Sequence, residues 1–168
     1  MILKIRTEGD PVLRKKAAPV TEIDDRMRQL ATDMLETMYA APGVGLAAPQ
    51  VGESVRLVVV DDGHGPYVLF NPEIVEAAGA VEEPEACLSI PGVQGMVRRA
   101  AKVVVRARSL NGSPITVVGA GLLAKALQHE IDHLDGVLFI DKATEIETVE
   151  DGDDSDAAGE DDDDQGED

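Results

Sequence analysis

The segment 128–133 reads Gln-His-Glu-Ile-Asp-His, with two histidines four residues apart and a glutamate directly after the first. Residues four apart lie one turn apart on the same face of an α-helix, so His129 and His133 can direct both imidazoles at one ion while Glu130 lies beside them. A histidine on an apolar helix face is more often an ordinary core residue. However, two of the three histidines in the chain have this ligand spacing, which favours a metal site.

A third metal ligand must come from elsewhere in the chain, because a catalytic metal usually takes three protein ligands and leaves one position open. The candidates are Cys87, Glu85, Asp141 or a carboxylate further downstream. Cys87 is the only cysteine, so it is a buried small hydrophobe, a reactive thiol or a metal ligand. Since a thiolate is a good partner for two imidazoles, the histidine pair favours Cys87 as the third ligand.

A glycine-rich stretch at 43–50 reads Gly-Val-Gly-Leu-Ala-Ala-Pro-Gln. Glycines let a backbone approach a ligand closely, and the amide of Gln50 can donate a hydrogen bond. Taken alone, the stretch is more simply interpreted as a loop between a helix and a strand.

Three segments together resemble the ordered motifs of the peptide deformylases: residues 43–50, Glu-Ala-Cys-Leu-Ser at 85–89, and residues 128–133. The resemblance extends from about residue 1 to 143 and includes Asp-Pro-Val-Leu-Arg at 10–14. This chain departs from the usual family pattern at Ala86, where relatives usually have glycine, and at Gln94, where they often have arginine or an aromatic residue.

The resemblance implies Cys87, His129 and His133 as metal ligands and Glu130 as the general acid and base. It also implies that the substrate carbonyl is held by the Gln50 side chain and the Leu88 backbone N–H, and that the Gly45 backbone meets the peptide. The natural metal would be Fe²⁺, which Zn²⁺ or Ni²⁺ can replace.

The reaction that the resemblance implies is removal of the N-formyl group from the initiator N-formylmethionine of nascent polypeptides. An ion held by two imidazoles and a thiolate would lower the pKa of bound water toward about 7, so that hydroxide can attack the formyl carbon. The methionine side chain needs an apolar slot, for which we expect Val44, Leu122 and Ala126 as walls.

Two other functions are compatible with parts of this pattern. A zincin-type protease also uses two histidines and a glutamate at this spacing, but it would take its third ligand downstream, where only Glu145 and Glu147 precede an acidic run. A structural metal site, or a deformylase-like binding protein without activity, would fit the departure at Ala86. The presence of Glu130 and Gln50 argues against both of these inactive forms.

Hydrophobic periodicity and turn residues predict an α+β fold, with small antiparallel or mixed sheets around a central helix that carries His129 and His133, and an amphipathic helix near the N-terminus. The predicted elements are a helical turn at 10–14, a helix at 24–40 ended by Pro42 and Gly43, strands at 55–60, 67–70, 74–79, 97–108 and 115–118, and a helix at 122–134.

The 168-residue chain has the length of one domain, but its formal net charge of −18 is unevenly distributed. Residues 150–168 contain 12 of the 33 acidic residues and none of the 15 basic ones, which leaves a net charge of −6 for residues 1–149. We therefore predict a catalytic domain over 1–149 and a disordered acidic tail over 150–168.

The same arithmetic disfavours several classes of protein. A negative body with an acidic tail would be repelled by phosphate backbones, so we expect no sequence-specific nucleic-acid binding. No apolar run approaches 18 residues, and charges fall where a signal peptide needs its apolar stretch, so we expect a cytoplasmic protein without a membrane partner. The expected partners are N-formylmethionyl nascent peptides. Since these peptides emerge from the ribosome, a transient association with the ribosome is compatible with this expectation.

Overall fold

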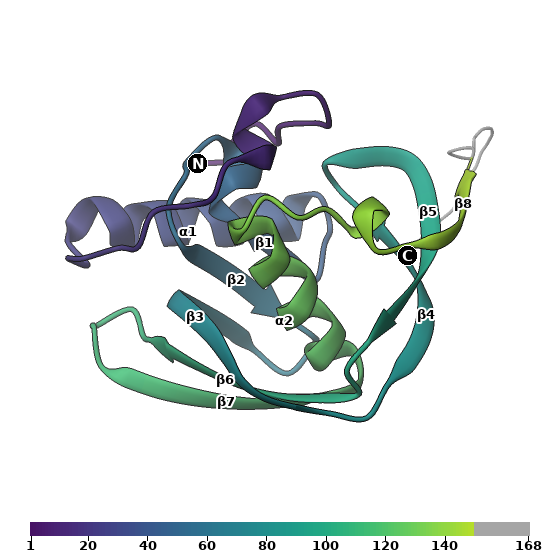
Figure 1. The fold of residues 1–168 in the computed structure, drawn as a ribbon. Helices are drawn as coiled ribbons and strands as arrows, with labels where there is room; N and C mark the ends of the chain where they lie inside the picture. The colour runs from purple at the N-terminus through teal and green to yellow at the C-terminus, as the bar shows by residue number, and fades with distance from the viewer. Residues whose placement is uncertain (150–168) are drawn as a thin grey trace.

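The computed structural model describes residues 1–149, which form two helices, two antiparallel sheets and three short 3-10 helices (Figure 1). In chain order the elements are η1 (Pro11–Arg14), α1 (Asp25–Ala40), β1 (Gly45–Ala47), η2 (Ala48–Val51), β2 (Leu57–Asp61), β3 (Pro66–Ala78), β4 (Val81–Cys87), β5 (Ile90–Arg99), β6 (Lys102–Arg108), β7 (Pro114–Ala120), α2 (Gly121–Leu134), η3 (Phe139–Asp141) and β8 (Thr144–Thr148). The predicted α+β class with antiparallel sheets is confirmed. The tail predicted over 150–168 lies outside the described residues.

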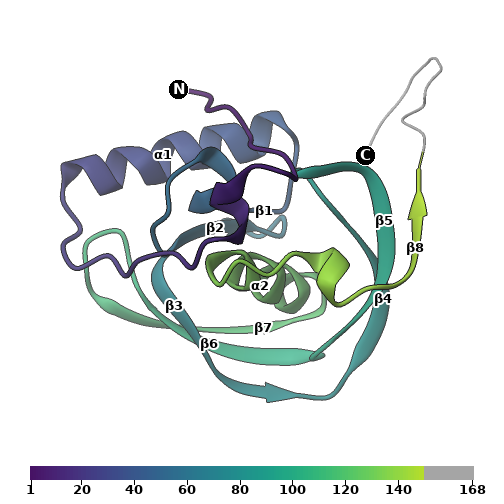
Figure 2. The same ribbon diagram turned by 45° about the horizontal axis from the view of Figure 1, so that its top comes forward.

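The five-stranded sheet has the order β1-β2-β3-β6-β7, and the three-stranded sheet has the order β4-β5-β8. Figure 2 shows α2 lying inside the curve formed by the two sheets. Strand β2 alternates its side chains between two apolar layers, because successive residues of a strand point to opposite faces. Val58 and Val60 pack in the cluster that includes α2, whereas Leu57 and Val59 pack in the cluster that includes α1.

Helix α1 begins after Asp24, whose side chain accepts a hydrogen bond from the Met27 N–H at 3.0 Å. Its apolar residues recur at steps of three and four, so Met27, Met34 and Met38 are buried against the sheet. The helix ends just before a cis peptide bond between Ala41 and Pro42. The chain then turns directly into β1, where a loop was predicted.

The prediction of one strand over 97–108 is wrong, because this segment is divided between two sheets. Strand β5 ends at Arg99 and β6 begins at Lys102. Between the two strands, the side-chain amide of Gln128 makes the hydrogen bonds to the Ala100 backbone that a neighbouring strand would otherwise make. Its Oε1 accepts from the Ala100 N–H at 3.0 Å, and its Nε2 donates to the Ala100 carbonyl at 2.9 Å.

The prediction of a separate strand over 74–79 is also wrong, since β3 continues without interruption to Ala78. A register shift between Phe70 and Glu73 disturbs the pairing with β6, and Asn71 has a φ of 53°. This bulge interrupts the apolar alternation, although the strand continues on both sides of it. Strands β4 and β8 were not predicted.

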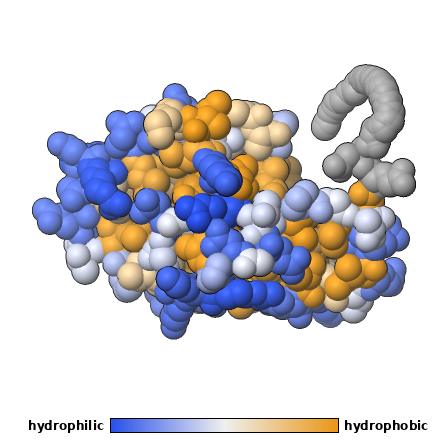
Figure 3. Space-filling model, turned by 90° about the horizontal axis from the view of Figure 1, so that it is seen from above, coloured by the Kyte–Doolittle hydropathy of each residue, from blue (hydrophilic) through white to orange (hydrophobic). Residues whose placement is uncertain are grey.

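Hydrophilic and apolar residues share the face seen from above (Figure 3). Among residues 1–149, the exposed apolar side chains include those of Val118 on β7 and Ile146 on β8. None of the helices in this part of the chain is long and apolar enough to cross a membrane.

Candidate active site

Cys87, His129 and His133 come together where the end of β4 meets α2. One potential ligand atom from each residue lies within 4.8 Å of the other two. The Cys87 Sγ is 3.4 Å from the His133 Nε2, and the two imidazole rings meet edge to face with their centroids 5.1 Å apart. Both histidines are buried and Cys87 is partly buried.

Glu85 fixes the orientation of the His129 ring through a hydrogen bond at Nδ1. Its Oε1 is 2.9 Å from the His129 Nδ1, and both of its oxygens accept hydrogen bonds from Arg99, at 2.8 and 2.9 Å. Burial alone would raise the pKa of Glu85, but the bonds from Arg99 and His129 outweigh it and lower the pKa to about 2. A carboxylate at this place keeps the proton of His129 on Nδ1 and leaves Nε2 free to bind an ion.

The charges around the two histidines favour a cation between them. Burial lowers the pKa of His129, but Glu130, Cys87 and Glu85 together outweigh it and raise the pKa to about 10. At His133, burial and then the neighbouring His129 lower the pKa to about 3, so that imidazole is neutral. The negative field that raises the pKa of His129 stabilises positive charge at this place, so a divalent cation can replace the proton on its Nε2, while His133 already offers a neutral nitrogen lone pair.

The donor set fits a divalent transition metal. One sulfur and two imidazole nitrogens are ligands that zinc and iron accept, and three protein ligands leave a position open for chemistry. Among the described residues, Glu130 Oε1 and His133 Nδ1 are buried side-chain atoms without a hydrogen-bond partner. Buried polar atoms are rarely left unpaired, so an unpaired carboxylate oxygen beside this cluster indicates a place where a further group binds.

Glu130 lies next to the three residues and packs directly against β1. Burial is the main reason why its pKa is raised to about 7, with a further contribution from Glu85, whereas His129 opposes the rise. A carboxyl group with such a pKa can both accept and return a proton near neutral pH. A Cβ on Gly45 would lie 2.8 Å from Cγ and Oε2 of Glu130, so only glycine allows this close approach.

Gln50 lies in η2, on the other side of the cysteine. Its Oε1 accepts a hydrogen bond from the Ala47 N–H at 2.9 Å, which fixes the amide. Its Nε2 donates to the Ser89 Oγ at 3.1 Å and is 3.6 Å from the Cys87 Sγ. The amide N–H groups are therefore directed toward the cysteine end of the site.

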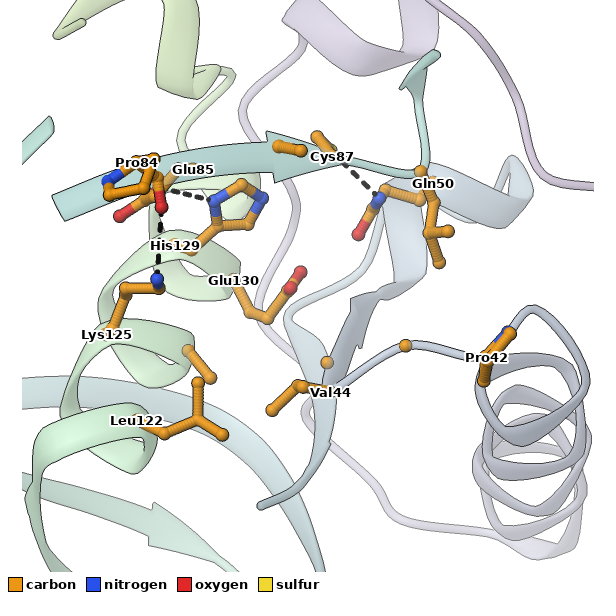
Figure 4. A pocket seen from close by; sticks show the side chains of 15 residues that line it. Pro42, Val44, Gln50, Pro84, Glu85, Cys87, Leu122, Lys125, His129 and Glu130 are labelled. Atoms are coloured by element: carbon orange, nitrogen blue, oxygen red, sulfur yellow. Dashed lines mark hydrogen bonds and ion pairs between the residues drawn. The ribbon is translucent and has the colours of Figure 1, made fainter. Parts of the chain in front are cut away.

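A pocket of about 400 Å³ opens onto this cluster (Figure 4). Apart from His133, which is fully buried, every predicted site residue lines it: Val44, Gly45, Gln50, Cys87, Leu88, Leu122, Ala126, His129 and Glu130. The lining also includes Gly43 of the glycine-rich stretch, and three residues that sequence reasoning missed: Pro42, Pro84 and Lys125. Lys125 could have been found, because it lies four residues before His129 and so on the same helix face.

The alternative third ligands lie outside the cluster. Glu85 contacts the far nitrogen of His129, and Asp141 pairs with Arg14 at 2.6 Å. Glu145 and Glu147, which a zincin-type site would need, are exposed on β8. The structure thus brings Cys87, and none of these carboxylates, together with the two histidines.

Residues 2–149 match the family described as polypeptide deformylase. Over 147 residues the chain is 55% identical to the peptide deformylase of Natranaerobius thermophilus, covering 86% of this chain and 94% of that protein. Over 145 residues it is 52% identical to the peptide deformylase of Dictyoglomus thermophilum, with 86% and 95% covered.

Solved structures of such proteins have a similar fold. The peptide deformylase from Legionella pneumophila superposes with a TM-score of 0.83 at 49% identity, over 86% of this chain and 88% of that one. The enzyme from Synechococcus elongatus, solved in complex with actinonin, gives a TM-score of 0.82 at 49% identity, over 84% and 79%. On both kinds of similarity, this chain belongs to the polypeptide deformylase family.

Proposed function

We propose that this chain is a metal-dependent peptide deformylase, which removes the N-formyl group from the initiator N-formylmethionine of nascent polypeptides. The observation that carries the proposal is the cluster of Cys87, His129 and His133 beside Glu130, at the wall of a pocket of about 400 Å³. The names of the relatives, all peptide deformylases, support the same reaction.

In this proposal Cys87, His129 and His133 hold the metal. The natural ion is Fe²⁺, and Zn²⁺ or Ni²⁺ can replace it, since one thiolate and two imidazoles suit all three. When bound, such an ion supplies Lewis-acid chemistry, which acidifies water and polarises a carbonyl group.

Glu130 moves the protons in this proposal. It takes a proton from the attacking water and delivers one to the nitrogen of the leaving amine, for which its raised pKa of about 7 is suited. The amide of Gln50 and the backbone N–H of Leu88 donate hydrogen bonds to the oxygen on which negative charge develops. Loss of one such donor typically costs about 10² to 10³ in rate.

The substrate peptide meets the backbone at Gly45. Strand β1 is at the edge of its sheet, and an edge strand can pair with an extended peptide. The methionine side chain occupies the part of the pocket between Val44, Leu122 and Ala126. A formyl carbon bears only hydrogen, so a site closely walled by the backbone of Gly45 and Leu88 admits it and excludes the methyl group of an acetyl.

We further propose that residues 1–149 are the catalytic unit and that the acidic segment 150–168 is not needed for chemistry. All the proposed site residues lie between Val44 and His133. Such an enzyme works in the cytoplasm, where formylated chains emerge from the ribosome, and its contact with the ribosome is transient.

The proposal is tested with protein purified without oxygen and loaded with Fe²⁺ or Ni²⁺. Formate release is measured from a formyl-Met tripeptide, and acetate release from the matched acetyl-Met tripeptide. We expect rapid hydrolysis of the formyl peptide and a rate at least about 10²-fold lower for the acetyl peptide, because the extra methyl group is excluded. No hydrolysis of the formyl peptide, or equal rates on both, would contradict the proposed function.

A further inference from the structure

Two side-chain hydrogen bonds, here called bridges, join α2 to β4 beside the pocket (Figure 4). The inner one joins His129 to Glu85 and belongs to the candidate metal centre. The outer one is made by Lys125, whose Nζ donates to the Pro84 carbonyl at 3.2 Å and lies 3.6 Å from a Glu83 carboxylate oxygen. Both Lys125 and Pro84 line the pocket, so the outer bridge is part of the pocket wall.

The acceptor of this bridge is a backbone group on an unpaired edge. Strand β4 is the edge strand of the three-stranded sheet, and β5 pairs with only one side of it. Only a quarter of the Lys125 side chain is exposed, so its methylene stem covers apolar surface while its ammonium reaches the strand. Leu122 lies about one turn before Lys125 on α2, and Leu122 and Ala126 line the same pocket as Lys125.

We propose that Lys125 is a positioning residue that sets the width of the side-chain slot by holding β4 against α2. The inference rests on the proposed function, because the slot is the place of the methionine side chain. With the bridge in place, the wall formed by Leu122, Ala126 and Pro84 cannot open, and the slot fits an unbranched side chain. Without it, the edge of β4 can move away from α2 and admit a wider side chain.

The bridge differs in its expected effect from an ordinary surface ion pair. Exposed pairs contribute about 0 to 1 kcal/mol to stability. The polar contacts of Lys125 are with Pro84 and Glu83, so its loss removes no hydrogen bond or ion pair of Cys87, His129 or His133. Its removal should therefore change which substrate binds, with little effect on the chemical step or on the melting temperature.

The test compares metal-loaded wild type with Lys125→Met, which keeps the length of the stem and removes the donor. Lys125→Arg keeps a donor at the same place, and Lys102→Met removes an ammonium from β6 that does not line the pocket. Values of kcat and KM are measured on formyl-Met and formyl-Phe tripeptides of otherwise equal sequence, and thermal melting is measured for each protein.

For Lys125→Met we expect the ratio of kcat/KM on formyl-Phe to kcat/KM on formyl-Met to rise about tenfold, mainly through KM. Lys125→Arg and Lys102→Met should keep the wild-type ratio. An unchanged ratio in Lys125→Met, or an equal change in Lys102→Met, would overturn the inference even though the wild type deformylates formyl-Met. A wild type that hydrolyses neither peptide would overturn the proposed function instead.

Discussion

Glu85 acts on the candidate metal centre through the orientation of a single imidazole ring. Its carboxylate lies between His129 and Arg99, and Arg99 also donates to Asp132 at 2.7 Å. Lys142 reaches the same Asp132 oxygen at 3.0 Å. This chain of charges holds His129 with its Nδ1 occupied, so that Nε2 faces Cys87 and His133.

For Glu85→Gln we expect metal affinity to fall by about 10- to 100-fold, as is typical when the partner of a metal-binding histidine is lost. The variant should also melt at a lower temperature, since the buried Arg99 loses its main counter-charge. The measurement is competition for Zn²⁺ with a chelator. Glu82→Gln on the same strand is the control, because Glu82 is exposed. Equal affinities in the two variants would contradict this role of Glu85.

At the residue scale, helical spacing was enough to place His129, Glu130 and His133 on one helix. The histidine pair already favoured Cys87 as the third ligand, and the likeness of three motifs assigned roles to Cys87 and Gln50. The apolar walls were expected from the need for a methionine slot, and the structure brings all of these residues to one pocket. Their chemical roles stay predictions. Arg99 could not be foreseen as a partner of Glu85, because the two are joined only when β4 pairs with β5.

At the scale of elements, two side-chain amides hold the backbone where the strands deviate from a regular pattern. Gln128 holds Ala100 at the crossing between the sheets, and Asn71 holds Val20 beside the bulge in β3. The apolar alternation continues through 97–108 although the chain changes sheet, so periodicity cannot reveal the crossing. Strand β8 was missed for a different reason: all of its residues are exposed, and only backbone pairing with β5 defines it.

Asn71 provides a test of this view. Its Oδ1 accepts from the Val20 N–H and its Nδ2 donates to the Val20 carbonyl, both at 2.8 Å, while its φ is 53°. Asn71→Ala should lower the free energy of unfolding by about 2 to 4 kcal/mol, because it loses two hydrogen bonds and places alanine in the left-handed region. The effect is measured by urea denaturation.

Asn71→Gly separates the two contributions to this loss. Glycine adopts the left-handed conformation without strain, so this variant should lose only the hydrogen bonds and be about 1 kcal/mol more stable than Asn71→Ala. If the alanine variant were as stable as the glycine variant, backbone conformation would not contribute at this bulge.

At the scale of the whole molecule, Arg14 and Asp141 join η1 to η3, which lie near opposite ends of the described chain. Arg14 donates to both Asp141 oxygens, at 2.6 and 3.1 Å, and to the Gly136 carbonyl at 3.2 Å. The hydrogen bond from Arg14 is the main reason why the pKa of Asp141 is lowered from its ordinary value of 3.8. Both side chains are substantially exposed, so solvent screens the pair.

The sign of the resulting pH dependence follows from the lowered pKa. The stabilisation is fully present above the unfolded pKa of 3.8 and is lost as the pH falls through the lower folded pKa. Asp141→Asn should therefore lower the free energy of unfolding by about 1 kcal/mol or less at pH 7, and the difference from wild type should shrink below about pH 4. Urea denaturation at several pH values measures this. A difference that grows on acidification would contradict the assignment.

The acidic segment 150–168 is expected to be separable from the catalytic unit. A chain that ends at Glu150 should keep the metal content of the full chain and its rate on a short formylated peptide within about twofold, since residues of such composition cannot offset their ordering entropy by burial. Metal analysis and formate release from the two proteins test this. If the shortened chain failed to bind metal, the proposed boundary would be wrong.

The central claim is that a metal held by Cys87, His129 and His133 serves hydrolysis in which Glu130 transfers the proton, and Glu130→Gln tests it most directly. Metal content and kcat on a formyl-Met tripeptide are measured on the same preparation. We predict full metal content with a rate at least about 10²-fold below wild type, because the proposed ligands remain while proton transfer is lost. Full metal content with more than about a tenth of the wild-type rate would contradict the account.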